Sequence, residues 1–263
     1  MTDSPAFLLS KWYLDCVAED GTAFIGYVAR LRWRVLPLDY ASILIRRPDG
    51  TEYTQMSLAR ESFQLEGSRI RWVSRHFRME AEWTRVQRPI ERELFNNDTG
   101  GIRWSCMIPL GKATITIRDR ATVRGFGYVE RMDLSIPPWH LPKAELRWGR
   151  FLTDTDAVVW IDWKGNRPLT LLLHNGNDVV GPVVTDDDIS GGNGFQLSFA
   201  QHTILRKGPI ISTTLSAIPG LAMVLPEQIL RMNETKWLSS GRLAHTGSPS
   251  RTGRAIHEVV AFS

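Results

Sequence analysis

The chain has 263 residues, of which 43% are hydrophobic and 23% charged, and its formal net charge is +4 at pH 7. This composition supports a substantial core and argues against long disordered segments. Basic residues are spread without any run of five, which disfavours nucleic acid as a partner, although the positive charge is compatible with contact to an anionic membrane surface. No apolar stretch reaches eighteen residues, and the first ten residues lack a basic signal-peptide region.

The two cysteines, Cys16 and Cys106, lie too far apart in the sequence to suggest a disulfide framework or a metal knuckle. With no signal peptide expected either, the sequence predicts a cytoplasmic protein with reduced thiols. A monomer or a homodimer is equally compatible with it.

Short segments rich in β-branched and aromatic residues, separated by turn residues, dominate the chain. They cover residues 12–18, 23–33, 42–46, 114–118, 157–163 and 169–174. Helical periodicity is weak, and we expect single helical turns only at 143–151 and 226–231. Many short strands predict an all-β fold of antiparallel barrels. The pair Pro137-Pro138 divides the chain into expected domains of residues 1–136 and 137–263, each large enough for one barrel.

In the first of these strands, Asp15 shares a face with Tyr13 and Val17, opposite the more apolar side of the strand. A carboxyl group within an apolar strand is costly to bury unless it is paired, hydrogen-bonded or protonated. Of the carboxyl groups on strands, Asp15 is the one for which the sequence gives the weakest expectation of burial.

The most informative strand covers residues 124–133. Side chains alternate along a strand, so Glu130 shares a face with Phe126, Tyr128 and Met132, and we expect this aromatic face to turn inward. Burial raises the pKa of a carboxyl group, as a general acid near neutral pH requires. A structural glutamate paired with an arginine is an equally good interpretation.

Two further carboxyl groups lie on apolar strand faces. Glu258 shares its face with Ile256 and Val260, and Asp162 shares its face with Val158 and Trp160. An ion pair or a hydrogen bond to a turn is the simpler interpretation of each, and a role in proton transfer is the alternative.

Several classes of chemistry find no support in the sequence. It contains no nucleophile elbow, no phosphate-binding loop and no dinucleotide-binding fingerprint. The six histidines never occur at metal-ligand spacing, and the acidic segment 186–188 lacks the ligand spacing of a calcium loop. We therefore expect neither a cofactor nor a bound metal.

Four segments in order along the chain, residues 12–21, 125–130, 146–151 and 253–258, resemble the carotenoid 1,2-hydratase (hydroxyneurosporene synthase) family and its AttH-like relatives. The resemblance implies two lipocalin-like (calycin) β-barrels in tandem, a hydrophobic isoprenoid-like substrate and no redox cofactor. After the acidic residue, the hydratases tend to carry an Asn-His-Gly type stretch, whereas this chain has residues 131–134, Arg-Met-Asp-Leu. This departure argues against hydration of a carotenoid.

These observations predict an enzyme that protonates a carbon–carbon double bond of a hydrophobic isoprenoid or polyene, as a hydratase or a cyclase does. Glu130 is the expected acid, Tyr128 would position it or relay the proton, and Glu258 and Asp162 are further catalytic candidates. Aromatic and apolar side chains that would contact the substrate or stabilise a carbocation are Trp12, Trp148, Trp160, Phe126 and Met132. The alternative is a non-catalytic lipocalin-like carrier of a hydrophobic small molecule.

Overall fold

The computed structural model describes residues 7–33, 36–142, 144–210, 227 and 231–262. The chain divides into two compact units, Met1–His140 (unit 1) and Leu141–Ser263 (unit 2). The domain limits expected from the sequence differ from these units only at residues 137–140, where a short 3-10 helix, η1 (Pro138–His140), falls in unit 1.

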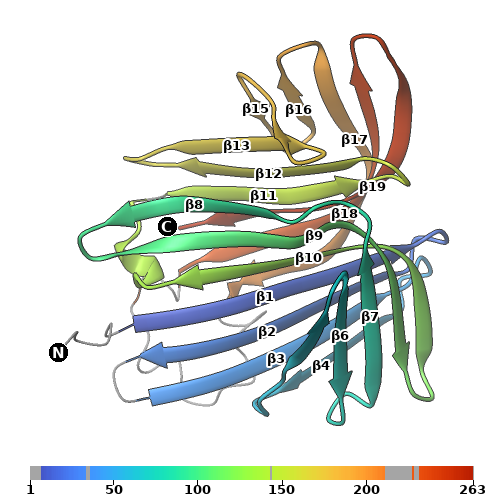
Figure 1. Cartoon of the computed structure of the whole chain (residues 1–263), viewed down its shortest axis with the longest axis vertical. Helices are drawn as coiled ribbons and strands as arrows, with labels where there is room; N and C mark the ends of the chain where they lie inside the picture. Colours follow the sequence, from blue (N-terminus) through green and yellow to red (C-terminus); the bar gives the residue numbers. More distant parts are fainter. Residues whose placement is uncertain (1–6, 34–35, 143, 211–226, 228–230, 263) are drawn as a thin grey trace. The chain divides into compact units, whose positions relative to one another are not determined.

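Unit 1 is one antiparallel sheet of ten strands with the order β4-β3-β2-β1-β10-β9-β7-β6-β5, and β8 pairs with β9 beside this path (Figure 1). Its strands are β1 (Phe7–Ala18), β2 (Ala23–Trp33), β3 (Leu36–Arg46), β4 (Glu52–Ser57), β5 (Phe63–Glu66), β6 (Arg69–Ser74), β7 (Met79–Arg85), β8 (Ile90–Asn97), β9 (Gly100–Ile117) and β10 (Ala121–Leu134). The last strand, β10, returns to pair with the first, β1.

Unit 2 is an antiparallel sheet of nine strands with the order β14-β13-β12-β11-β19-β18-β17-β16-β15. Its strands are β11 (Glu145–Leu152), β12 (Ala157–Lys164), β13 (Leu169–His174), β14 (Asn177–Asp178), β15 (Val183–Val184), β16 (Asp188–Gly191), β17 (Phe195–Pro209), β18 (Asn233–His245) and β19 (Ser248–Ala261). Here too the last strand pairs with the first, so the topology of unit 1 is repeated.

The all-β antiparallel fold class is confirmed, and each of the six expected strand segments contributes to an observed strand. The helical turn expected at 143–151 is wrong, because β11 pairs with β12 on one side and with β19 on the other. Backbone pairing on both sides outweighs the weak helical pattern of this segment. The turn expected at 226–231 lies outside the described residues, apart from 227 and 231. In the described part of the chain, no helix is long and apolar enough to cross a membrane.

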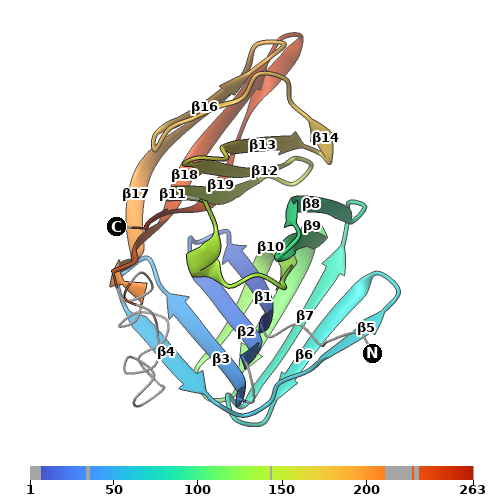
Figure 2. The ribbon, with the colours of Figure 1, turned by 90° about the vertical axis from the view of Figure 1, so that its left-hand side faces the viewer.

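The core of unit 1 shows how its sheet is curved. Ile43 of β3 and Trp72 of β6 stand far apart in the strand order, yet both belong to one cluster of buried apolar residues. The sheet therefore curls around this cluster, as Figure 2 shows for β1 to β10. Leu14 and Val129, from the paired strands β1 and β10, also belong to it. We call this surface of the sheet the core face of unit 1.

Unit 2 has its own apolar cluster. Phe151, Trp160, Leu197 and Ala255 are among its members, and they come from β11, β12, β17 and β19. We call the surface of the sheet that carries them the core face of unit 2.

Candidate functional site

A transverse row of buried side chains crosses unit 1 on the face opposite its core face. The strand register places Ser42, Tyr27, Tyr13, Glu130 and Cys106 directly beside one another on β3, β2, β1, β10 and β9. All five are buried, and Glu130 is only 6% exposed. The row brings a carboxyl group, a thiol and three hydroxyl groups to the centre of the sheet.

Two hydrogen-bond donors hold the Glu130 carboxyl group. The Trp104 indole Nε1–H donates to Glu130 Oε2 at 2.5 Å, and the Tyr128 hydroxyl donates to the same oxygen at 2.7 Å. Trp104 and Tyr128 are fully buried. An indole nitrogen can only donate, so Oε2 acts as an acceptor in this hydrogen bond.

Tyr128 and Cys106 stay protonated at this site. Burial, reinforced by the neighbouring Cys106 and Glu130, raises the pKa of the Tyr128 hydroxyl well above its usual value. Burial also raises the pKa of the Cys106 thiol, against a hydrogen bond with Tyr128 that lowers it. Tyr128 is therefore suited to orient the carboxyl group as a neutral donor, and Cys106 is not an activated nucleophile.

The expectation that the Glu130 face turns into the core is wrong, although Glu130 is buried as expected. The core face of β10 carries Val129 and the small residue Gly127. A side chain at Gly127 would place its Cβ 2.8 Å from Cδ1 of Trp83, so this ring occupies the space beside the bare backbone. The sequence pattern assigned the wrong face of β10 to the core because it counted Gly127 as non-apolar. Glycine has no side chain, so a large ring from another strand can pack closely against it.

Asp15 also differs from its expectation. It was the carboxylate with the weakest prediction of burial, yet it is 0% exposed and lies beside Tyr128 in the register of β1 and β10. Its backbone carbonyl accepts a hydrogen bond of 2.7 Å from Trp83 Nε1. Asp15 thus adds a second carboxyl group next to the Glu130 row.

The predicted substrate-contact residues of unit 1 fall on two faces. Phe126 and Met132 lie on the Glu130 side of β10 and are half-buried. Trp12 lies on the core side, where its ring packs 4.7 Å from that of Phe63. The structure therefore groups Phe126 and Met132, but not Trp12, with Glu130.

In unit 2, Glu258 forms an ion pair with Lys236, and its side chain is 13% exposed. Lys236 is almost completely buried, and its ammonium group lies 5.2 Å from the ring centroid of Trp148. The register places Lys236, Glu258 and Trp148 side by side, away from the core face. The ring face of Trp148, predicted to stabilise a substrate cation, thus contacts a cation of the protein.

Asp162 and Trp160 lie on the core face of unit 2. Asp162 is buried and accepts a hydrogen bond of 2.7 Å from Thr170 Oγ1. Trp160 packs against Phe199 within the apolar cluster. Trp148 and Trp160, both predicted to contact the substrate, stand on opposite faces of this sheet.

Unit 2 also contains a histidine pair that the sequence did not reveal. The Ser239 hydroxyl lies 2.8 Å from Nδ1 of His202 and 2.8 Å from Nε2 of His257. The His257 ring is stacked against Phe199 and Trp237. Burial, with the charges of His202 and Lys236, lowers the pKa of His257 to about 3, so this ring is neutral at pH 7. The described residues contain no cluster of three metal-binding side chains.

Trp104 and Cys106 are the members of the Glu130 site that sequence reasoning missed. β9 carries irregular pairing with β10 on both sides of Val129, and this register sets Cys106 opposite Glu130 and Trp104 opposite Met132. A regular ladder counted from the turn between the strands would place other residues there. The bulges leave no signal in the sequence of β9 that identifies the partner of Glu130.

Comparison with solved structures finds the same fold at low sequence identity. CghA, in a crystal structure with Sch210972, superposes with a TM-score of 0.62 at 14% identity, covering 97% of this chain and 89% of CghA. Kievitone hydratase from Nectria haematococca gives a TM-score of 0.55 at 9% identity, covering 98% and 89%. A putative AttH from Nitrosomonas europaea gives 0.55 at 11%, covering 98% and 93%. No protein-family model and no curated protein sequence matches the chain.

The expected all-β fold of two tandem lipocalin-like (calycin) antiparallel β-barrels is confirmed by these neighbours, which the chain matches over nearly its whole length. The specific resemblance to carotenoid hydratases is not shown. At these identities the likeness concerns the fold alone, and the chain shares the double-calycin architecture of a hydratase without sharing its sequence.

Proposed function

We propose that this protein is a cofactor-independent enzyme that protonates a carbon–carbon double bond of a hydrophobic isoprenoid or polyene. The observation that carries the proposal is Glu130, a buried carboxyl group whose Oε2 accepts hydrogen bonds from Trp104 and Tyr128. The shared fold with a hydratase supports the same reaction class.

The reaction begins with proton transfer from the Glu130 carboxyl group to one carbon of the double bond, whose π electrons form the new C–H bond. The other carbon becomes a carbocation, and Glu130 becomes a carboxylate. Attack by water followed by loss of one proton gives hydration, whereas attack by an internal alkene followed by loss of a proton gives cyclisation. Tyr128 holds the carboxyl group in place, and Phe126 and Met132 supply the apolar surface beside it.

A lipocalin-like carrier is the competing function. Glu130, Tyr128 and Trp104 are almost completely buried, as the members of a purely structural hydrogen-bond cluster would be. A structural role for these residues favours the carrier. A carrier would bind the hydrophobic molecule and release it unchanged. For the enzyme, we also propose the cytoplasmic location that the sequence predicts.

Isotope labelling separates the two functions. The protein is incubated in deuterium oxide with geranylgeraniol or lycopene, and the extracted lipid is analysed by mass spectrometry. An enzyme of this type introduces one non-exchangeable deuterium on carbon, because the Glu130 proton exchanges with solvent. In water enriched in oxygen-18, hydration adds the heavy oxygen and cyclisation does not. Recovery of bound but unlabelled lipid would support the carrier instead.

The Glu130→Gln variant tests the assignment of the acid, because the amide keeps the shape but has no transferable proton. Glu61→Gln is its matched control. Glu61 accepts a hydrogen bond from the Trp72 indole nitrogen at 2.9 Å, as Glu130 does from Trp104, but it has no proposed role in the reaction. Deuterium incorporation should disappear in Glu130→Gln and persist in Glu61→Gln.

A further inference from the structure

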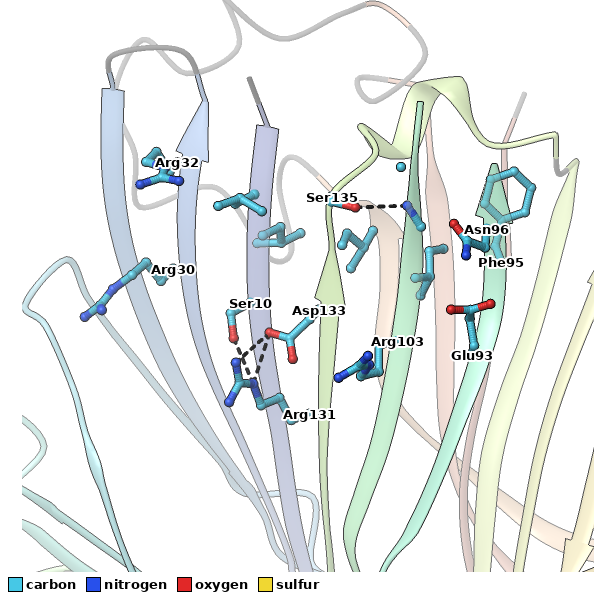
Figure 3. Close-up of a pocket in the computed structure, with 16 residues that line it drawn as sticks. Ser10, Arg30, Arg32, Glu93, Phe95, Asn96, Arg103, Arg131, Asp133 and Ser135 are labelled. Atoms are coloured by element: carbon cyan, nitrogen blue, oxygen red, sulfur yellow. Dashed lines mark hydrogen bonds and ion pairs between the residues drawn. The ribbon is translucent and has the colours of Figure 1, made fainter. Parts of the chain in front are cut away.

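A pocket of about 600 Å³ opens in unit 1 beside the ends of β1, β2, β9 and β10 (Figure 3). Its lining includes Ser10, Arg131 and Asp133, and the register places all three on the core side of β1 and β10. Arg131 follows Glu130 directly in β10, so the two side chains leave opposite faces of the strand. The polar side chains of the pocket therefore lie on the face opposite Glu130, whereas Leu134 and its cross-strand neighbour Ile102, also in the lining, lie on the Glu130 side of their strands.

Positive charge dominates the lining. Four arginines, Arg30, Arg32, Arg103 and Arg131, line the pocket together with the acids Glu93 and Asp133. A volume of this size lies within the usual range for small-molecule sites. The excess of guanidinium groups favours a negatively charged ligand.

Two of the arginines are held by acidic partners. Arg131 donates through Nε and Nη2 to Asp133 Oδ1 at 3.0 and 2.8 Å, and through Nε to the Ser10 hydroxyl at 3.2 Å, an arrangement visible in Figure 3. Arg30 donates to Asp39 at 2.9 Å. These two guanidinium groups are largely compensated and fixed in orientation.

Arg32 and Arg103 differ from this pair. Among the described residues, neither guanidinium group forms a hydrogen bond or an ion pair, and both residues are exposed. Glu93 stands opposite Arg103 in the register of β8 and β9, but no ion pair joins them. Arg32 and Arg103 thus bring two uncompensated fork-shaped donors to one pocket, and such donors match the oxygens of a carboxylate or a phosphate.

The remaining lining is mixed: Asn96, Ser135 and two glycines stand beside apolar residues that would contact the other half of the ligand. Leu8, Phe95, Ile102 and Leu134 contribute to the wall. Deeper within the curled sheet, the core cluster that includes Leu14 occupies the interior. A ligand that fits must therefore be compact, with one oxyanion and a short apolar body.

We propose that this pocket binds a small amphiphilic anion, a carboxylate or phosphate carrying a short apolar chain, through Arg32 and Arg103. Arg131, fixed by Ser10 and Asp133, orients the polar side of the pocket. Its charged β10 side chains lie on the opposite face from Glu130, and the site goes beyond the proposed reaction without depending on it.

Calorimetric titration of the whole protein with octanoate, octyl phosphate, octanol and octylammonium tests this proposal. Octanoate or octyl phosphate should bind at least tenfold more tightly than octanol and octylammonium, with an affinity that falls as salt concentration rises. Inorganic phosphate, which lacks the apolar chain, should bind more weakly than octyl phosphate. Equal affinities for octanoate and octanol, or no binding of either anion at millimolar concentration, would overturn the proposal.

Arginine variants locate the site. Arg32→Ala and Arg103→Ala should each weaken octanoate binding about tenfold, and the double variant should abolish it. Arg118→Ala is the matched control, since Arg118 is another exposed arginine of unit 1 and lines a different pocket. These side chains are exposed, so the variants should fold, and circular dichroism verifies this. Unchanged octanoate affinity in the Arg32 and Arg103 variants would contradict the assignment.

Discussion

The two units place a glutamate at the same point of the same topology. Glu130 lies on β10 and Glu258 on β19, each on the last strand of its unit and away from the core face. Each follows a glycine by five residues, Gly125 and Gly253. A Cβ at these glycines would lie 2.0 Å from the Val17 carbonyl oxygen and 2.2 Å from that of Leu152, so in both units the last strand closely approaches the first.

Their cross-strand neighbours differ. In unit 1, Cys106 on β9 lies opposite Glu130 on β10. In unit 2, Lys236 on β18 lies opposite Glu258 on β19. A buried ammonium group fixes Glu258 as a carboxylate partner, whereas Glu130 is held by indole and phenol donors. One position of the fold thus provides an ion pair in one unit and a candidate proton donor in the other.

The largest expected effect concerns Glu130→Gln. Positioned acid catalysis contributes roughly 100- to 10,000-fold, so turnover of a substrate identified by labelling should fall by about that factor while its affinity is retained. Steady-state kinetics and ligand titration measure both quantities. A folded variant with wild-type turnover would exclude Glu130 as the acid.

Cys106→Lys gives unit 1 the cross-strand neighbour of unit 2, because it places an ammonium group where unit 2 has Lys236. The cation should hold Glu130 in its ionised form, and turnover should fall by about 100-fold. Cys106→Met controls for side-chain length without charge. Melting curves establish that both variants are folded, and equal turnover in the two would show that a positive charge at position 106 does not affect the reaction.

Glu258→Gln should act mainly on stability, because it leaves the buried ammonium group of Lys236 without its counter-charge. Removing one partner of a buried ion pair typically costs about 3–5 kcal/mol, and since the amide oxygen still accepts a hydrogen bond we expect about 2–3 kcal/mol. Chemical denaturation measures the loss. Combining the change with Lys236→Met should recover part of it, whereas no loss in the single variant would mean that the ion pair contributes little.

Acid should weaken unit 2 through His257, a feature that unit 1 lacks among its described residues. The pKa of His257 is about 3 in the folded protein against an ordinary value of 6.5, so its stabilising contribution is present above pH 6.5 and is lost as the pH falls toward 3. Between pH 6.5 and 5 the loss should reach about 2 kcal/mol.

Denaturation at a series of pH values measures this slope. His257→Phe keeps an aromatic ring between Phe199 and Trp237 and should flatten it. Hydrogen exchange should report earlier opening of β18 and β19 than of β1 and β10 on acidification. Equal pH dependence of the wild type and the variant would contradict the role of His257.

A structural feature of this protein is predictable from the sequence when local residue pattern determines it, and is not when strand pairing determines it. The segments 23–33 and 169–174 coincide with β2 and β13, because alternation and turn residues fix them locally. The burial of Glu130 was also predictable, since its neighbours on one face are apolar or aromatic. These features need only a few adjacent residues.

The partners of Glu130 required information that no short segment carries. The irregular register of β9 sets Cys106 and Trp104 beside β10, and the Trp83 ring fills the space over Gly127 from another strand. Likewise, His202 and His257 meet only because β17 and β19 both flank β18, which carries Ser239. Such contacts depend on register and topology, which the sequence does not display locally.

The smallest expected effect is a difference in labelling rate between two cysteines that lie on opposite faces of the sheet in unit 1. Cys16 belongs to the core cluster, while Cys106 lies in the Glu130 row and pairs with Ile90 of β8, a strand that pairs only with β9 among the described strands. Both thiols are buried, and the pKa of the Cys106 thiol is raised, so both should react slowly with a thiol reagent.

A substrate can reach Glu130 only if this face opens locally, and local opening costs less free energy than global unfolding. Cys106 should therefore be labelled at least about tenfold faster than Cys16 under native conditions, as measured by mass spectrometry of the single-cysteine variants Cys16→Ala and Cys106→Ala. Identical slow rates would mean that only global unfolding exposes the Glu130 row, and a catalytic role for Glu130 would then lack a route of access.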